Sequence, residues 1–291
     1  MNTIWNDIKS NYKSGTSFTR ILYINLGFFI LYKLLFVFSF LFDTGEIDVF
    51  IKDYLALPSN SVLLLKKPWT FISYMFVHQS FFHLLFNMVW FHLGSKLFLQ
   101  YFNGKQLIST YILGGISGGL LFITAFNVFP VFSSDVLNSS VVGASASVIA
   151  VFIAISTYSP NYRISIPFIG NIPLKYIAIT LIVLDVLSIS PENPGGHIAH
   201  IGGAIFGYIY VSILKRGIDI SVNFYNFINF FSQKKKHKKS KKVNTRKSDD
   251  IFRSEKAEKQ KHINSILEKI SKSGYESLTK EEKELLFKES K

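Results

Sequence analysis

Six long apolar segments restrict the fold of this chain more than any other feature of its sequence. Each is close to the roughly 20 residues that an α-helix needs to cross the hydrocarbon core of a bilayer. Because backbone N–H and C=O groups in lipid must be bonded within the protein, we expect each segment to be a helix. The sequence therefore predicts an all-α membrane protein. The segments span about residues 21–42, 71–95, 108–131, 142–158, 173–190 and 197–214.

The composition agrees with this prediction and excludes some chemistry. Hydrophobic residues make up 48% of the 291-residue chain, and they are gathered in these long runs. The chain has no cysteine, so disulfides and thiolate metal ligands are excluded. The first 20 residues are polar and lack the apolar core and cleavage site of a secretory signal peptide. We therefore expect the first apolar segment itself to direct insertion into the membrane.

The positions of Lys and Arg predict the orientation in the membrane. Cytoplasmic loops carry an excess of these residues. They occur in the N-terminal stretch and after the second, fourth and sixth segments, whereas loops 132–141 and 191–196 have none. We expect a multi-pass protein of the cell membrane with both termini in the cytoplasm. The long loop 43–69 carries both charge signs, and we expect it to be structured at the interface. Lys33, inside the first segment, is expected to snorkel or to face a cavity.

The charge distribution divides the chain into three parts. Residues 1–216 carry 13 Lys/Arg against 8 Asp/Glu, and residues 217–291 carry 19 against 11, within a total net charge of +13. We expect a membrane domain over 1–216, an amphipathic and basic juxtamembrane linker over 217–260, and a small cytoplasmic helical hairpin over 261–291.

The linker has two distinct halves. Residues 217–233 have the pattern of an amphipathic helix lying on the inner membrane surface. Residues 234–247 hold nine Lys/Arg in fourteen positions and are expected to be solvated and to bind anionic lipid. Nucleic-acid binding is disfavoured because no aromatic residue is interleaved in this run. In the hairpin, Thr279 and Glu282 form a capping-box pattern that opens a second helix after a first at 262–272.

Ser145 and His200 are polar side chains that lie in apolar segments. A polar group without a partner in hydrocarbon costs several kcal/mol, so such residues usually face a bundle interior or a cavity and serve a function. A hydroxyl with an imidazole is the minimum equipment for nucleophilic catalysis. These two residues therefore indicate hydrolytic chemistry inside a membrane.

His83 and Asn87 are four residues apart in the second segment, so they share one helix face and both can donate hydrogen bonds. They are either a structural polar pair or oxyanion donors placed where charge develops on a scissile carbonyl. The backbone N–H of Ser145, at a helix start, could join them. Ser147, two residues further, should point about 200° away and serves as an internal comparison.

Small residues mark where helices approach each other closely. Glycines at spacing four permit close backbone contact in lipid. We therefore expect the third and sixth segments to be tightly packed, the sixth being the helix that bears His200. The glycines are Gly114, Gly115, Gly118, Gly119, Gly203 and Gly207.

Three motifs follow one another along the chain: His83 with Asn87, then Gly143-Ala144-Ser145-Ala146, then Ala199-His200-Ile201-Gly202-Gly203 followed by Gly207. Together and in this order they resemble the motifs of the rhomboid intramembrane serine proteases. The resemblance covers roughly residues 68–212. The tail beyond the core resembles the tails of some bacterial members. Three positions depart from the family pattern: Ala146 stands where a glycine is usual, Thr70 follows Trp69 where an arginine is usual, and the glutamate usual after the second segment is replaced near Gln100.

The resemblance implies a six-transmembrane-helix rhomboid-like bundle with a small helical cytoplasmic tail, acting as a serine-type endopeptidase. It implies a Ser145–His200 catalytic dyad, with His83, Asn87 and the Ser145 amide as oxyanion donors. Its partners would be transmembrane protein substrates, cut near the outer face, and no metal or cofactor would be needed. His197 is a second candidate base, but only His200 has the glycines that the pattern requires.

Several alternatives stay open. Because the family works with a dyad, we favour Asp185 bonding to the outer loop or to His197, although it could orient an imidazole. The main functional alternative is a catalytically inactive rhomboid-like protein that binds membrane helices. A metal site built from His83, Asp185, His197 and His200 is weaker, since no His-Glu-x-x-His motif occurs, and a transporter would leave Ser145 and His200 unexplained.

Overall fold

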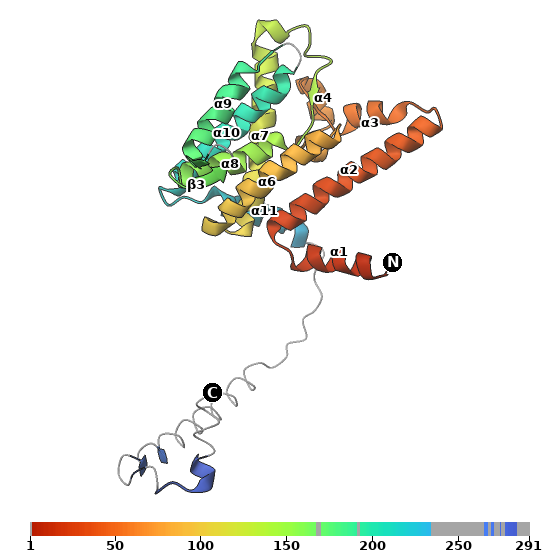
Figure 1. Ribbon diagram of the computed structural model, residues 1–291. Coiled ribbons are helices and arrows are strands. Elements are labelled where there is room, and N and C mark those ends of the chain that lie inside the picture. Colours follow the sequence, from red (N-terminus) through yellow and green to blue (C-terminus); the bar gives the residue numbers. More distant parts are fainter. Residues whose placement is uncertain are drawn as a thin grey trace. The chain divides into compact units, whose positions relative to one another are not determined.

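The computed structural model divides by internal contacts into two units, Met1–Ser232 and Gln233–Lys291, which we describe separately. The first unit is helical, with two short antiparallel strand pairs (Figure 1). The structure describes residues 2–166, 170–190, 193–233, 265–266, 269–270, 274 and 277–283.

The helical elements of the first unit follow one another along most of its length, with short connections between them. In chain order they are α1 (Asn2–Ser14), α2 (Ser17–Leu41), α3 (Glu46–Tyr54), α4 (Ser61–Lys66), α5 (Thr70–Ser73), η1 (Tyr74–Phe76), α6 (Phe81–Tyr101), α7 (Gly104–Val128), η2 (Pro130–Phe132), α8 (Ser145–Tyr158), α9 (Leu174–Leu187), α10 (Pro194–Leu214) and α11 (Ile220–Gln233).

Two antiparallel strand pairs complete the unit. In the first, Leu57 of β1 (Leu57–Pro58) pairs with Val141 of β2 (Ser140–Val141). This pair ties the loop before α4 to the segment just before α8. The second pair joins β3 (Arg163–Ile166) to β4 (Gly170–Pro173) between α8 and α9.

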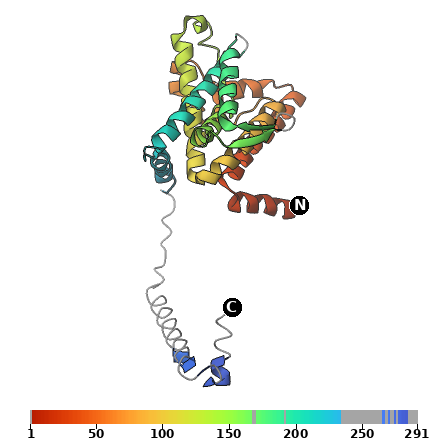
Figure 2. The ribbon, with the colours of Figure 1, turned by 60° about the vertical axis from the view of Figure 1, so that its left-hand side comes forward.

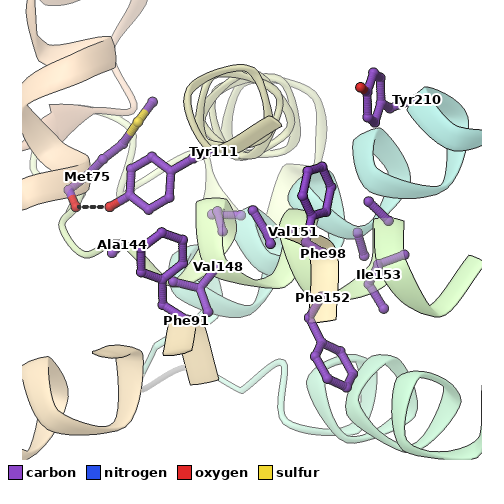
Figure 3. Packing of buried hydrophobic residues seen from close by; sticks show 14 of the residues in the cluster. Met75, Phe91, Phe98, Tyr111, Ala144, Val148, Val151, Phe152, Ile153 and Tyr210 are labelled. Atoms are coloured by element: carbon purple, nitrogen blue, oxygen red, sulfur yellow. Dashed lines mark hydrogen bonds between the residues drawn. The ribbon is translucent and has the colours of Figure 1, made fainter. Parts of the chain in front are cut away.

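Helix α8 lies at the centre of the unit, among α6, α7 and α10 (Figure 1). Ten of its fourteen residues are buried. Figure 3 shows Val148, Val151 and Phe152 of α8 packed among buried side chains from neighbouring helices. At one side of this core, the Tyr111 hydroxyl of α7 donates to the Met75 carbonyl at 3.5 Å.

Glycines let α7 and α10 approach α8 from two sides. A Cβ atom at Gly203 or Gly207 of α10 would collide with the backbone carbonyl of Ala146 or Ala150 of α8. From α7, a Cβ at Gly118 would lie 2.6 Å from the Ala146 Cβ. The predicted close packing of the third and sixth segments is therefore confirmed, and both of these helices pack against the serine-bearing helix.

Three of the described helices are long and apolar enough to cross a membrane: α2, α7 and α10. Helix α8 is apolar but shorter. Many apolar side chains of α2 are exposed, as expected for a surface in contact with lipid. The six-span count stays a prediction. In both views α1 and α11 lie at the same end of this unit (Figures 1 and 2). The placement of both termini in the cytoplasm stays a prediction.

The predicted start of the second segment is wrong. Residues 71–76 form the short elements α5 and η1, and the long helix α6 begins only at Phe81. The reason is local: Ser80 has an extended backbone and its hydroxyl accepts a hydrogen bond from the His83 N–H at 3.2 Å. This N-cap starts the helix shortly before His83 and Asn87.

The loop over residues 43–69 is structured, as predicted. It contains α3, β1 and α4. The Tyr32 hydroxyl of α2 donates to Asp48 Oδ1 at 2.9 Å, which attaches α3 to α2. The Trp69 indole donates to the Tyr54 carbonyl at 2.8 Å and closes the loop.

The helix predicted over 217–233 is observed as α11, from Ile220. Its contact with lipid stays a prediction. The basic run 234–247 lies outside the described residues, as does most of the first hairpin helix predicted over 262–272.

In the second unit, the capping box is present as predicted. The Thr279 N–H donates to Glu282 Oε2 at 2.7 Å, and the Glu282 N–H donates to Thr279 Oγ1 at 3.3 Å. Lys269 Nζ lies 3.0 Å from the same carboxylate. The hydrogen bond from the Thr279 N–H and, to a smaller extent, the bond from the Lys269 ammonium lower the pKa of Glu282 below its usual value. Ile266 and Leu278 are buried.

Candidate active site

A cavity of about 730 Å³ lies beside the start of α8. Its walls come from four helices, α6, α8, α9 and α10, and from the turn that joins β2 to α8. Much of the wall is apolar, including Trp90 and Phe152, whose rings meet edge to face at 5.3 Å. All four side chains predicted to form the site line this cavity, together with two further titratable residues. The six are His83, Asn87, Ser145, Asp185, His197 and His200.

Ser145 is the first residue of α8, at the edge of the cavity. Two hydrogen bonds hold the turn before it: the Gly143 N–H donates to the Tyr74 carbonyl at 2.8 Å, and the Ala144 N–H donates to His78 Nε2 at 3.5 Å. His78 is buried, and this bond gives it a structural role at the serine turn. The Ser145 N–H belongs to the first helical turn, where N–H groups have no intrahelical acceptor.

Gly143 brings the His83 ring close to the serine turn. Its φ of 124° lies in a region that side chains rarely adopt. A Cβ atom at this position would lie 2.7 Å from His83 Nε2 and 3.8 Å from Ser145 Oγ. The absence of a side chain therefore allows His83 to approach the backbone beside the nucleophile.

Asn87 is buried and lies one turn from His83 on α6. Its Nδ2 donates to the His83 carbonyl at 2.9 Å, so this bond reaches the backbone of His83 and not its ring. An amide NH₂ carries two protons, so this bond leaves one for a ligand in the cavity. The arrangement is compatible with the predicted oxyanion role.

Ser147 is the predicted contrast to Ser145, and it faces the other way. It is fully buried, and a Cβ added to Gly115 of α7 would lie 2.5 Å from its hydroxyl oxygen. Ser147 does not line the cavity. The predicted difference in direction between the two serines is therefore confirmed.

His200 and His197, on successive turns of α10, converge on one carboxylate of α9. Asp185 Oδ1 lies 2.8 Å from His200 Nδ1 and 2.9 Å from His197 Nδ1. All three side chains are partly buried. Of the alternatives for Asp185, the favoured bond to His197 is present, and the carboxylate also contacts the imidazole of His200, the alternative that we favoured less. The reason is geometric, because the carboxylate lies between both imidazoles.

Ser145 and His200 face the same cavity, but no hydrogen bond joins them among the described residues. Catalytic hydrogen bonds are often long before substrate binds and tighten in the complex. The donor set of Asp185, His197 and His200 could also hold a metal ion, since their ligand atoms all lie within 4.8 Å of one another.

Lys33 has a role that the sequence did not predict. Its Nζ donates to the Gln79 carbonyl at 2.8 Å and lies 4.8 Å from the centre of the Tyr32 ring. Gln79 lines the cavity just before α6. The lysine therefore holds the segment that leads to His83, and its position inside an apolar segment was the available signal.

Comparison with known families agrees with this geometry. Residues 65–217, more than half of the chain, match the family described as the Rhomboid domain. Residues 247–291 match a family of unknown function, DUF6576. No curated protein matches the chain. Together with the apolar helices α2, α7 and α10, the first match identifies a membrane protein.

Proposed function

We propose that this chain, which belongs to the rhomboid family, is an intramembrane serine endopeptidase that cleaves transmembrane segments of other proteins. The observation that carries the proposal is the convergence of Ser145, His200, His83 and Asn87 on one cavity. These residues come from α6, α8 and α10, which pack around one core. A nucleophile, a base and oxyanion donors are the parts that acyl transfer needs.

In the proposed reaction, Ser145 Oγ attacks the carbonyl carbon of the scissile peptide bond while His200 takes its proton. The negative charge that develops on the carbonyl oxygen is stabilised by Asn87, His83 and the Ser145 N–H. Breakdown of this intermediate breaks the C–N bond, and His200 gives its proton to the leaving amine. Water, activated by His200, then hydrolyses the acyl-enzyme and releases Ser145.

The membrane setting of the proposal is a six-helix bundle with both termini in the cytoplasm and cleavage near the outer face. Exposed apolar side chains on α2 and α9 support it, since these surfaces suit contact with lipid. We propose lipids as partners for the same reason, with anionic lipid at the basic run 234–247.

An inactive protein that only binds membrane helices is the second candidate. It would need neither a serine at the start of α8 nor an imidazole facing the same cavity. Because Ser145, His200, His83 and Asn87 all face that cavity, the catalytic proposal accounts for more of the site than the binding proposal.

The experiment is cleavage of a membrane-spanning reporter by the purified, detergent-solubilised full chain. Ser145→Ala should abolish cleavage because the nucleophile is removed. Ser147→Ala, two residues further along the same helix and outside the cavity, should cleave within about twofold of wild type, since it loses only a hydroxyl that has no hydrogen bond in the described structure. Equal cleavage by wild type and Ser145→Ala would contradict the proposal, as would activity lost on chelation and restored by zinc.

A further inference from the structure

Asp185 is the only acidic side chain among the described residues that line the cavity. It lies near the end of α9 and faces α10 across the cavity wall. A single oxygen of its carboxylate contacts the Nδ1 atoms of both His200 and His197, at 2.8 and 2.9 Å. A carboxylate oxygen only accepts hydrogen bonds, so each Nδ1 must carry the proton that it shares with Asp185.

We propose that Asp185 is a positioning residue for His200, so that the proposed Ser145–His200 pair works as a three-residue relay; this inference rests on the proposed function. With Nδ1 protonated and bonded to Asp185, a neutral His200 has its lone pair on Nε2. Nε2 is then the atom that takes the proton of Ser145 Oγ. The nearby negative charge also stabilises the imidazolium that forms when the serine proton is transferred.

His197 has a different part in this arrangement. The Asp185 side chain is 14% exposed, in a protein whose surroundings are largely lipid. A carboxylate in such a place is costly unless it is paired and hydrogen-bonded. The bond from His197 Nδ1 supplies a second donor and fixes the carboxylate on the α10 side. His197 therefore holds Asp185 in place, and Asp185 orients His200.

The distances favour hydrogen bonds over a metal ion. Ligands about 2.0–2.2 Å from a tetrahedral metal are spaced about 3.3–3.5 Å from each other. The two Nδ1–Oδ1 separations of 2.8 and 2.9 Å are shorter than this and are ordinary hydrogen-bond lengths. An ion could enter only if both imidazoles moved away from the carboxylate.

The test compares Asp185→Asn with Asp48→Asn, in the full chain in detergent. Asp48, in helix α3 of the loop, accepts a hydrogen bond from Tyr32 of α2 and does not line the cavity. Asp48→Asn therefore controls for the loss of a carboxylate elsewhere in the protein. In Asp185→Asn the new amide keeps the shape but offers its oxygen or its NH₂, so the His200 tautomer is no longer fixed. We expect kcat to fall at least about 100-fold with KM within about twofold, and Asp48→Asn to stay within about twofold for both. Removal of a fully buried relay aspartate costs about 10⁴-fold in kcat.

A spectroscopic readout tests the inference independently of activity. The imidazole ¹⁵N spectrum of wild type should show His200 as the Nδ1–H tautomer, and Asp185→Asn should shift it toward Nε2–H. The other titratable groups facing this cavity are His83 on α6 and His197 on α10. The chain has 7 histidines, so a His200→Gln sample identifies the signal. This result also holds if no reporter is cleaved, which would defeat the proposed function alone.

Three outcomes would overturn the inference. One is an Nε2–H tautomer for His200 in wild type, which decides the matter even if Asp185→Asn does not fold. Another is wild-type kcat in a folded Asp185→Asn protein. The third concerns the two imidazoles: His197→Ala should retain measurable cleavage while His200→Ala abolishes it, and the reverse pattern would assign the relay to His197.

Discussion

Helices α8 and α9 have the same length and a similar apolar composition, yet they are held in the protein in different ways. Both have 14 residues and both line the cavity. Ten residues of α8 are buried, but only Leu174 and Ala178 of α9 are. Helix α8 carries the proposed nucleophile, and α9 carries only the carboxylate behind the proposed base.

The difference arises from neighbours rather than from composition. Glycines of α7 and α10 allow both helices to contact α8 at backbone distance, and α6 covers a third side. Helix α9 packs against α10 and, less extensively, against α8, and it presents large apolar side chains outward, among them Leu187, which is 75% exposed. Packing therefore fixes the position of Ser145, whereas two polar bonds fix the position of Asp185.

Matched isoleucine truncations test this comparison most strongly. Ile155 in α8 is 0% exposed, and Ile179 in α9 is 56% exposed. Ile155→Ala leaves a cavity in the packed core and should lower the free energy of unfolding by about 2–5 kcal/mol. Ile179→Ala removes a side chain that faces outward and should change it by less than about 0.5 kcal/mol. Thermal unfolding in detergent measures both, and equal losses would show that α9 is as tightly packed as α8.

A pair of glycine-to-alanine substitutions tests the same comparison, with a smaller expected loss of stability than Ile155→Ala. Gly203→Ala places a methyl group against the Ala146 carbonyl, next to Ser145, and should cost about 1–3 kcal/mol of stability. Because a displacement near 1 Å can cost about 100-fold in rate, kcat/KM should fall more than stability alone explains.

The control is Gly27→Ala in α2, where an added Cβ meets nothing within 4 Å. Its stability should stay level or rise by up to about 1 kcal/mol, because alanine favours a helix. Wild-type kcat/KM in Gly203→Ala would show that the serine does not depend on close packing of α8 and α10.

Much of this arrangement could be predicted because its signals are local or periodic. Glycines at spacing four indicated which helices pack closely. Spacing four placed His83 and Asn87 on one face, and a spacing of two turned Ser147 away from Ser145. Each of these follows from helix geometry within a single segment.

The remaining features depend on contacts between segments, which local patterns do not encode. The bond from Asp185 to His200 crosses from α9 to α10 and depends on the angle at which these helices meet. The bond from Lys33 to the Gln79 carbonyl depends on where α2 lies against the loop before α6. The late start of α6 was not predicted because hydrophobicity continues through α5 and η1. The N-cap at Ser80, and not the apolar pattern, decides where the helix begins.

The most direct test of the central claim is to identify the residue that an alkyl fluorophosphonate modifies. Such a reagent phosphonylates a serine that a neighbouring base activates, and the site is found by mass spectrometry of the digested protein. We predict one adduct, on Ser145, formed in step with the loss of reporter cleavage and absent from His200→Ala, while Ser147 stays unmodified. Undiminished cleavage by protein fully modified at Ser145, or complete inhibition with Ser145 unmodified, would contradict the account.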